Sequence, residues 1–209
     1  MIKNIIFDFG DIFINLDQQG TYKAMAALGV TNISNDMIDV YHNYEKGLIS
    51  TDEFIDFYMV KFPSLKKQDL IHAWNAVLLD FPLYRLEFIK KLALSKKYRL
   101  FLLSNTNELH ISWIQDRVGS VFYETFKNCF EQFYVSHEIH FRKPDIEIFE
   151  FVLNSNTLLA KETLFIDDLS ENTKTAEKLG IQVWNLNPKK EDVINLFDSK
   201  TFNFDFSYS

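Results

Sequence analysis

The chain has 209 residues, which suffices for one large domain or two small ones with their own hydrophobic core. Its 22 Lys and Arg against 29 Asp and Glu give a net charge of -7, so it lacks the basic footprint that binding to nucleic acid or an anionic membrane requires. With Cys129 as its one cysteine and no apolar run of membrane-spanning length, we expect a cytoplasmic protein with a reduced, buried structural thiol.

Short apolar segments predict the strands of a parallel sheet, because near-continuous apolar strands are typical of sheets covered on both faces. Amphipathic helical patterns alternate with these segments along the chain, and Gly180 marks the end of one such helix, while Pro144 suits the first turn of another. We therefore expect an α/β fold with a Rossmann-like doubly wound parallel sheet. The predicted strands are residues 2–9, 99–103, 133–135, 163–166 and 181–184. The predicted helices of this part are residues 83–92, 146–153 and 170–179.

A helical insertion separates the first strand from the second. Helical periodicity recurs through residues 18–80, with a capping-box pair at Ser50 and Glu53 and a stop near Pro63. This pattern predicts four helices that fold as a small cap, residues 17–80, on a catalytic core of residues 1–16 and 81–209. At the other end, aromatic and polar residues alternate over 202–208, which leaves an edge strand and a loosely held tail as alternatives.

Polar residues follow three of the predicted strands. Asp8 follows the first, Ser104 and Asn105 the second, and Asp167 and Asp168 the strand at 163–166. Ligands of open parallel sheets bind beyond the carboxyl ends of the strands. Each residue alone is consistent with a strand end or a helix cap, but three carboxylates together require a compensating cation. Oxygen ligands without a Cys or His cluster indicate Mg²⁺.

Lys143 adds a positive charge to this predicted site, since it directly precedes Pro144 and a predicted helix. Three carboxylates, a hydroxyl and a lysine suit phosphoryl transfer, in which the cations neutralise phosphate oxygens and one carboxylate attacks phosphorus. The chain has no glycine-rich Walker loop, which argues against nucleotide binding of the P-loop kind.

The sequence resembles the haloacid dehalogenase superfamily, whose four motifs occur in this chain in order. They are IIFDFGDIF at 5–13, LFLLSNTN at 100–107, RKP at 142–144 and LFIDDLSEN at 164–172. The insertion, with YEKGLISTDEF at 44–54, is similar to that of the helical-cap subfamily. Within it, LLSNTNELH and FRKPDIEIFEFVL are most similar to the branch of bacterial α-D-glucose-1-phosphate phosphatases and the phosphatase domain of epoxide hydrolases.

The resemblance implies a Mg²⁺-dependent phosphatase that hydrolyses a small phosphorylated metabolite, a sugar phosphate, through an aspartyl-phosphate. Asp8 would be the nucleophile, and Lys143 would stabilise both the nucleophile and the phosphate. Ser104 and the Asn105 amide would bind phosphate. Asp8, the Gly10 carbonyl and Asp168 would ligate Mg²⁺, while Asp167 and Asn172 would support the site.

One position departs from the pattern of the superfamily. Most of its phosphatases carry a general acid and base two residues after the nucleophile, where this chain has Gly10. Losing general acid catalysis, which contributes about 10²- to 10⁴-fold, slows the cleavage of poor leaving groups most. We therefore expect an anomeric sugar phosphate to be favoured. Asp11 is adjacent, but its side chain is expected to point the other way along an extended strand.

Two alternatives remain at this stage. One is a catalytically weak phosphate-binding or interaction protein of the same fold, with Trp74 and the cap aromatics as its contact surface. The other is a metal-independent dehalogenase, against which the retention of both Asp167 and Asp168 argues. His110 is a further candidate for a role in the site, since the predicted helix after the phosphate-binding turn would carry it toward the cap.

Overall fold

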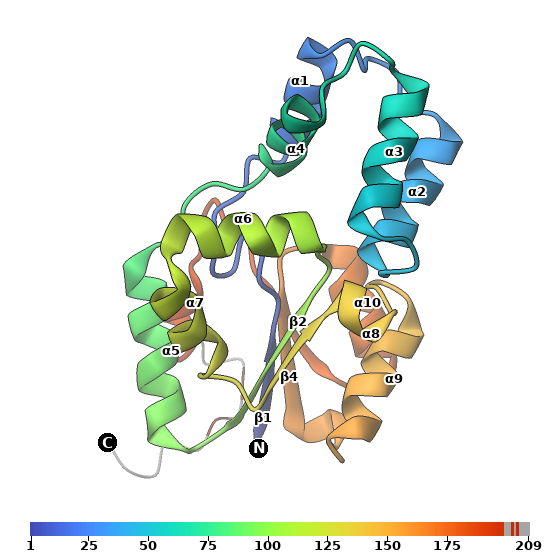
Figure 1. The fold of residues 1–209 in the computed structure, drawn as a ribbon. Coiled ribbons are helices and arrows are strands. Elements are labelled where there is room, and N and C mark those ends of the chain that lie inside the picture. The colour runs from blue at the N-terminus through green and yellow to red at the C-terminus, as the bar shows by residue number, and fades with distance from the viewer. Residues whose placement is uncertain (199–201, 203, 205–209) are drawn as a thin grey trace.

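The computed structural model describes residues 1–198, 202 and 204, and these form a layered α/β core below a separate group of helices (Figure 1). The strands are β1 (Asn4–Phe7), β2 (Arg99–Ser104), β3 (Gln132–Val135), β4 (Thr163–Asp167) and β5 (Gln182–Asn185). The helices are α1 (Gly20–Ala27), α2 (Asn35–Glu45), α3 (Thr51–Lys61), α4 (Lys67–Asn75), α5 (Leu83–Ser95), α6 (Glu108–Val118), α7 (Ser120–Lys127), α8 (Ser136–Ile139), α9 (Ile146–Ser155) and α10 (Ser170–Lys178), with short 3₁₀ helices η1 (Ala160–Glu162) and η2 (Val193–Asn195).

The strands form one parallel sheet in the order β3-β2-β1-β4-β5. In the central strand, Phe7 pairs with Leu102 of β2 and with Ile166 of β4, so the carboxyl ends of these three strands are level. This order confirms the predicted parallel α/β fold, and the observed strands match the predicted ones within a few residues.

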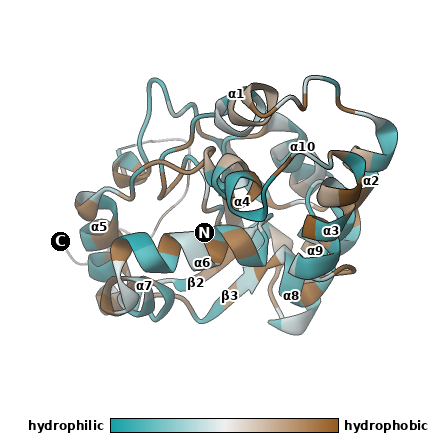
Figure 2. Cartoon of the chain, turned by 45° about the horizontal axis from the view of Figure 1, so that its top comes forward, coloured by the Kyte–Doolittle hydropathy of each residue, from teal (hydrophilic) through white to brown (hydrophobic). Residues whose placement is uncertain are grey.

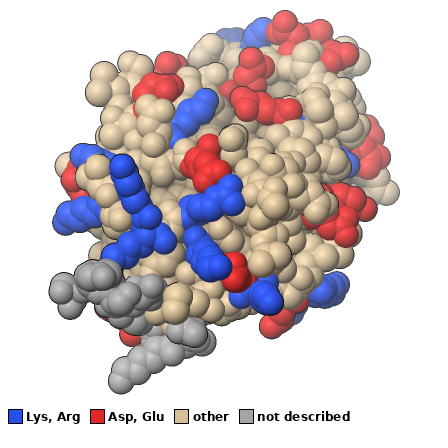
Figure 3. Space-filling model, turned by 90° about the horizontal axis from the view of Figure 1, so that it is seen from below, with Lys and Arg blue, Asp and Glu red and all other residues tan. Residues whose placement is uncertain are grey.

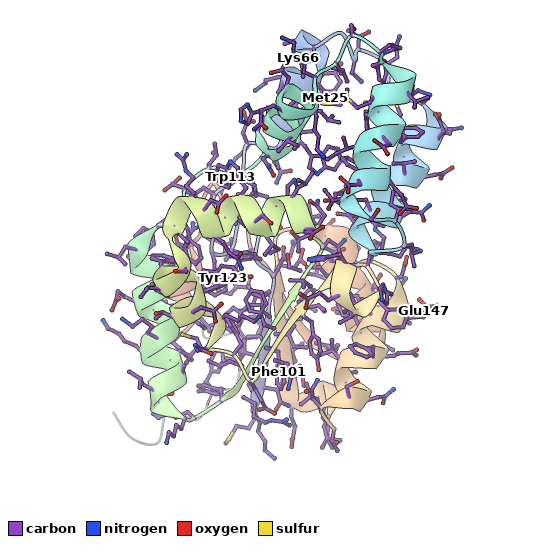
Figure 4. All side chains as sticks on the ribbon, viewed as in Figure 1. Met25, Lys66, Phe101, Trp113, Tyr123 and Glu147 are labelled. Atoms are coloured by element: carbon purple, nitrogen blue, oxygen red, sulfur yellow. The ribbon has the colours of Figure 1, made fainter. Side chains whose placement is uncertain are left out.

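Alternation along each strand distributes the core between the two faces of the sheet, because successive side chains point to opposite sides. Ile5 and Phe7 pack with α5 and α7 on one face, whereas Ile6 packs with α9 and α10 on the other. Phe101, in β2 next to the central strand, lies in the lower part of the sheet (Figure 4). The covering helices carry hydrophobic and hydrophilic bands side by side, as α5 and α6 show in Figure 2.

Much of the aromatic content lies in the core on the α5 and α7 face of the sheet. Phe9 stacks on Phe126 with ring centroids 5.2 Å apart, and Phe13 meets the same ring edge-on at 4.9 Å. Cys129 lies at the edge of this cluster, where its thiol donates to the Thr125 carbonyl. Burial raises the pKa of the Cys129 thiol, but the residue is half-buried, less than the sequence suggested.

Helices α1–α4, called the cap, lie over the carboxyl edge of the sheet and have a hydrophobic cluster of their own (Figure 1). Met25 reaches from α1 into the space between these helices (Figure 4). Trp74 is 7% exposed and packs on Phe54 at 4.6 Å between ring centroids. The predicted capping box is confirmed, since Ser50 accepts from the Glu53 N–H and the Glu53 carboxylate accepts from the Ser50 N–H.

The start of α9 differs from the prediction. Pro144 precedes α9 and does not enter its first turn, because Asp145 is the N-cap and the helix begins at Ile146. The Lys143–Pro144 peptide bond is cis.

The predicted edge strand at 202–208 lies outside the described residues except for Phe202 and Phe204, which are not in a strand. Among the helices that the structure describes, none combines the length and apolar character needed to cross a membrane.

Candidate active site

The carboxyl ends of β1, β2 and β4 bring the predicted site residues to one place. Asp8 directly follows β1, Ser104 ends β2, and Asp167 ends β4. Carboxylate oxygens of Asp8, Asp167 and Asp168 lie within 4.8 Å of one another. The sequence predicted this convergence because level parallel strands end at one edge of the sheet.

Lys143 is the cation at the centre of this cluster. Its ammonium donates to Asp8 Oδ1 at 2.7 Å, to Asp167 Oδ2 at 2.8 Å and to the Leu103 carbonyl at 2.8 Å. The residue is 1% exposed, so these bonds form in a region from which water is excluded. Burial opposes the charge, yet Asp167 and Asp8 more than offset it, and the pKa of Lys143 is raised.

Asn105 holds the backbone of Lys143 in place. Its side-chain Nδ2 donates to the Lys143 carbonyl at 2.7 Å, and its Oδ1 accepts from the Lys143 N–H at 2.8 Å. Both polar atoms of the amide side chain are therefore engaged within the protein. The Asn105 side chain orients the lysine, a role that the sequence did not suggest for it.

Asp167 and Asp168 have different surroundings although they are adjacent. The Asp167 carboxylate is fully buried and accepts from Lys143, from Asn172 Nδ2 at 3.0 Å and from the Leu169 N–H at 2.8 Å. Asp168 lines the cavity above the sheet. The contact from Asn172 holds the Asp167 carboxylate in place beside Lys143.

The carboxylates exceed the positive charge that the protein supplies to them. Burial raises the pKa of Asp8 to about 6, although Lys143 opposes the shift. Burial, followed by repulsion from Asp8 and Asp167, raises the pKa of Asp168 to about 7. Three carboxylates against one ammonium therefore leave room for a divalent cation, and an all-oxygen donor set suits Mg²⁺.

A cavity of about 300 Å³ opens above the cluster, between the sheet and the cap. The core contributes Asp8, Gly10, Ser104, Lys143 and Asp168 to its lining. Such a volume is at the low end of the roughly 300–1,000 Å³ range of ligand sites, which favours a small ligand. Seen from the opposite end of the molecule, Lys and Arg side chains gather on the face far from this cavity (Figure 3).

The loop that holds Gly10 and Asp11 turns the Asp11 carboxylate away from the cavity. A Cβ at Gly10 would lie 2.8 Å from Leu16 Cδ1, so Leu16 occupies the space next to this position. The Asp11 carboxylate turns to its own loop, where it accepts from the Leu16 N–H at 3.0 Å and from Gln18 Nε2 at 2.8 Å. Asp11 is not among the residues that line the cavity.

His110 reaches the cavity, as the sequence allowed, but both ring nitrogens have partners. Nδ1 lies 3.2 Å from Asn107 Nδ2, and Nε2 lies 3.3 Å from the Trp74 carbonyl. Because a carbonyl only accepts, Nε2 carries the proton. Burial lowers the pKa of His110 to about 4, so the ring is neutral near neutral pH and offers no acidic proton.

Three further cavity residues were not singled out from the sequence. Tyr41 and Glu45 come from α2 of the cap, and Arg142 comes from the loop before α9. Glu45 lies within the stretch YEKGLISTDEF and Arg142 begins the RKP motif, so the motifs themselves contained the signal. Their pairing across the boundary between cap and core became visible only in the fold.

A match to a known protein family, which covers most of the chain, accompanies this fold and this cluster of site residues. Residues 5–186 match the family described as haloacid dehalogenase-like hydrolase, and the chain belongs to that family. It is 31% identical to the D-ribitol-5-phosphate phosphatase of Bacteroides thetaiotaomicron over 88% of this chain and 91% of that protein.

Solved structures of the same family are also similar to the chain. A HAD family enzyme from Bacteroides thetaiotaomicron, in complex with magnesium and inorganic phosphate, aligns with a TM-score of 0.79 and 34% identity over 94% of this chain and 100% of that one. A predicted HAD-like family hydrolase from Porphyromonas gingivalis aligns with a TM-score of 0.82 and 30% identity over 95% and 97% of the two chains.

Proposed function

We propose that this hydrolase is a Mg²⁺-dependent phosphatase that releases phosphate from a small sugar or sugar-alcohol phosphomonoester. The observation that carries the proposal is the buried contact of Lys143 with both Asp8 and Asp167, beside Asp168 at the mouth of a small cavity. The relative named for D-ribitol 5-phosphate and the structure with magnesium and phosphate bound support it.

Asp8 is the nucleophile in this proposal. Lys143 binds Oδ1, which leaves Oδ2 to attack phosphorus. The Oδ2–phosphorus bond forms as the bond from phosphorus to the substrate oxygen breaks, and the released alkoxide takes a proton from water. A second water then attacks the aspartyl-phosphate, which frees inorganic phosphate and restores Asp8.

Phosphate oxygens would be held by the Ser104 hydroxyl and the Asn105 backbone N–H. The Lys143 ammonium, whose three N–H groups have partners within the protein, would contribute its positive charge. Asp8, the Gly10 carbonyl and Asp168 would hold Mg²⁺, since the oxygens of Asp167 are taken up by other partners. When bound, Mg²⁺ neutralises negative charge on the phosphate and on the carboxylates.

The likeness to a D-ribitol-5-phosphate phosphatase favours a phosphate on a primary alcohol. It gives no support to the anomeric preference expected from Gly10, which stays a prediction. Comparing D-ribitol 5-phosphate with glucose 1-phosphate and glucose 6-phosphate separates the two.

The test is phosphate release with and without Mg²⁺ by the wild type and by Asp8→Asn, with Asp11→Asn as a matched control beside the site. We expect Mg²⁺-dependent turnover in the wild type and in Asp11→Asn, and none in Asp8→Asn. Equal phosphate release by wild type and Asp8→Asn would rule the proposal out. Trp74, one of the aromatic residues on which the interaction alternative depended, is buried within the cap.

A further inference from the structure

A second polar group, formed by Tyr41, Glu45 and Arg142, lines the cavity. The Tyr41 hydroxyl donates to Glu45 Oε1 at 2.6 Å, and Arg142 Nε donates to Glu45 Oε2 at 3.0 Å. The first contact lies within α2, and the second links α2 of the cap to the residue directly before Lys143. All three side chains line the cavity that also contains Asp8 and Ser104.

The three side chains form a balanced and well-buried group. The side chain of Glu45 is 6% exposed and that of Arg142 is 17% exposed, so one negative and one positive charge compensate each other away from bulk water. Burial, and then the Glu45 carboxylate, raise the pKa of Tyr41, which therefore keeps its hydroxyl proton. The Tyr41 ring is fixed independently, since it packs edge-on against Trp74 at 5.7 Å.

We propose that Tyr41, Glu45 and Arg142 bind the hydroxyl groups of the substrate and select a neutral polyhydroxylated tail over a charged or an alkyl one. This inference rests on the proposed phosphatase function, because these residues line the same cavity as Asp8 and Ser104.

Hydroxyl groups suit this surface because each can both donate and accept. Each oxygen of Glu45 accepts one bond within the protein and can accept another from a substrate hydroxyl, while the guanidinium of Arg142, which has four N–H groups besides Nε, donates to the next. An alkyl tail forms no hydrogen bond with these groups and displaces the water that would otherwise bind them. Sites that hydrogen-bond a substrate hydroxyl therefore discriminate strongly against analogues that lack it.

A tail that carries its own negative charge is disfavoured for a different reason. Glu45 faces it with a carboxylate whose charge Arg142 already compensates, and Glu171 lines the same cavity. The paired Glu45 and Arg142 therefore offer no net positive charge to an anionic tail, and Glu171 repels it. Selectivity follows from the pairing of Glu45 with Arg142 rather than from the size of the cavity alone.

The experiment compares three substrates that share a primary phosphate ester: D-ribitol 5-phosphate, n-pentyl phosphate and 5-phospho-D-ribonate, in which a carboxylate ends the chain. We expect kcat/KM for ribitol 5-phosphate to exceed that for each of the others by at least about tenfold. Tyr41→Phe should reduce the ratio of ribitol 5-phosphate to pentyl phosphate by about fivefold, the effect of one neutral hydrogen bond.

Two variants separate recognition from the docking of the cap. Tyr44→Phe also removes a buried hydroxyl from α2, one that bonds to Thr51 and to the Leu109 N–H but does not line the cavity. It should leave the substrate ratios at their wild-type values. Glu45→Gln frees the charge of Arg142 and should shift the ratio of phosphoribonate to ribitol 5-phosphate upward by at least about tenfold.

Each outcome decides something. Wild type that releases no phosphate from any substrate overturns the proposed function, and the inference with it. Wild-type turnover of pentyl phosphate as fast as of ribitol 5-phosphate overturns the inference alone. So does an equal change of the substrate ratios in Tyr41→Phe and Tyr44→Phe, which would mean that the hydroxyls only position the cap.

Discussion

Replacing Lys143 by Met removes the cation that lies between Asp8 and Asp167. The two carboxylates, 8% and 0% exposed, then lose the ammonium that contacts them at 2.7 and 2.8 Å. Breaking a buried ion pair in this way costs about 3–5 kcal/mol. For a protein of this size, that loss of unfolding free energy lowers the melting temperature by roughly 6–20 °C.

The loss should depend on pH in a defined direction. The folded-state pKa of Asp8 is about 6, above its ordinary value of 3.8, so the carboxyl is neutral in acid and charged in base. Its attraction to Lys143 is therefore present above this pKa and fades as the pH falls below it. In the variant, a charged Asp8 has no ammonium beside it, and its stability should recover toward acid pH.

The assay is urea unfolding of metal-free wild type and Lys143→Met at about pH 8 and about pH 5. Lys67→Met is the matched control, because Lys67 pairs with Asp52 at 3.2 Å on the surface, with side chains 58% and 82% exposed. That control should cost at most about 1 kcal/mol. A Lys143→Met deficit no larger than the control at about pH 8, or one that grows toward about pH 5, would refute the reasoning.

Three other perturbations test separate parts of the structure. Gly10→Asp should lower the unfolding free energy by about 1–3 kcal/mol because its Cβ would meet Leu16, and adding Leu16→Ala should restore part of it; denaturant titration that finds no such recovery contradicts the packing argument. Calorimetric Mg²⁺ affinity should fall from about pH 8 to about pH 5.5, since Asp168 and Asp8, with pKa values of about 7 and about 6, take up protons that compete with the metal; pH-independent affinity would place the metal elsewhere. Ser50→Ala should destabilise the protein by about 1 kcal/mol in thermal unfolding through loss of its cap, and an unchanged melting temperature would show that the capping box contributes nothing.

The sequence was sufficient where the physics is local. The strand at β1 and its end at Asp8 follow from an uninterrupted apolar run, and the start of α3 follows from Ser50 three residues before Glu53. Local patterns also indicated the four helices of the cap between residues 17 and 80. The site residues at strand ends could be grouped because parallel strands have level carboxyl ends.

The sequence was insufficient where one side chain must choose between partners. The amide of Asn105 was expected to bind phosphate, but only the fold shows that its side chain binds the backbone of Lys143, 38 residues away. Asp11 and Gly10 are neighbours, but only the loop geometry shows that Asp11 turns to Gln18 and that Leu16 fills the space beside Gly10.

By itself, then, the sequence determined the class of fold, the family and which residues gather at the edge of the sheet, because hydrophobic periodicity and strand ends are encoded in neighbouring residues. The tertiary structure decided which of the gathered groups touch. It placed Lys143 between Asp8 and Asp167, and it paired Glu45 with Arg142 across 97 residues of chain. Such contacts depend on how elements far apart in the chain pack against each other, and patterns among neighbouring residues do not specify that packing.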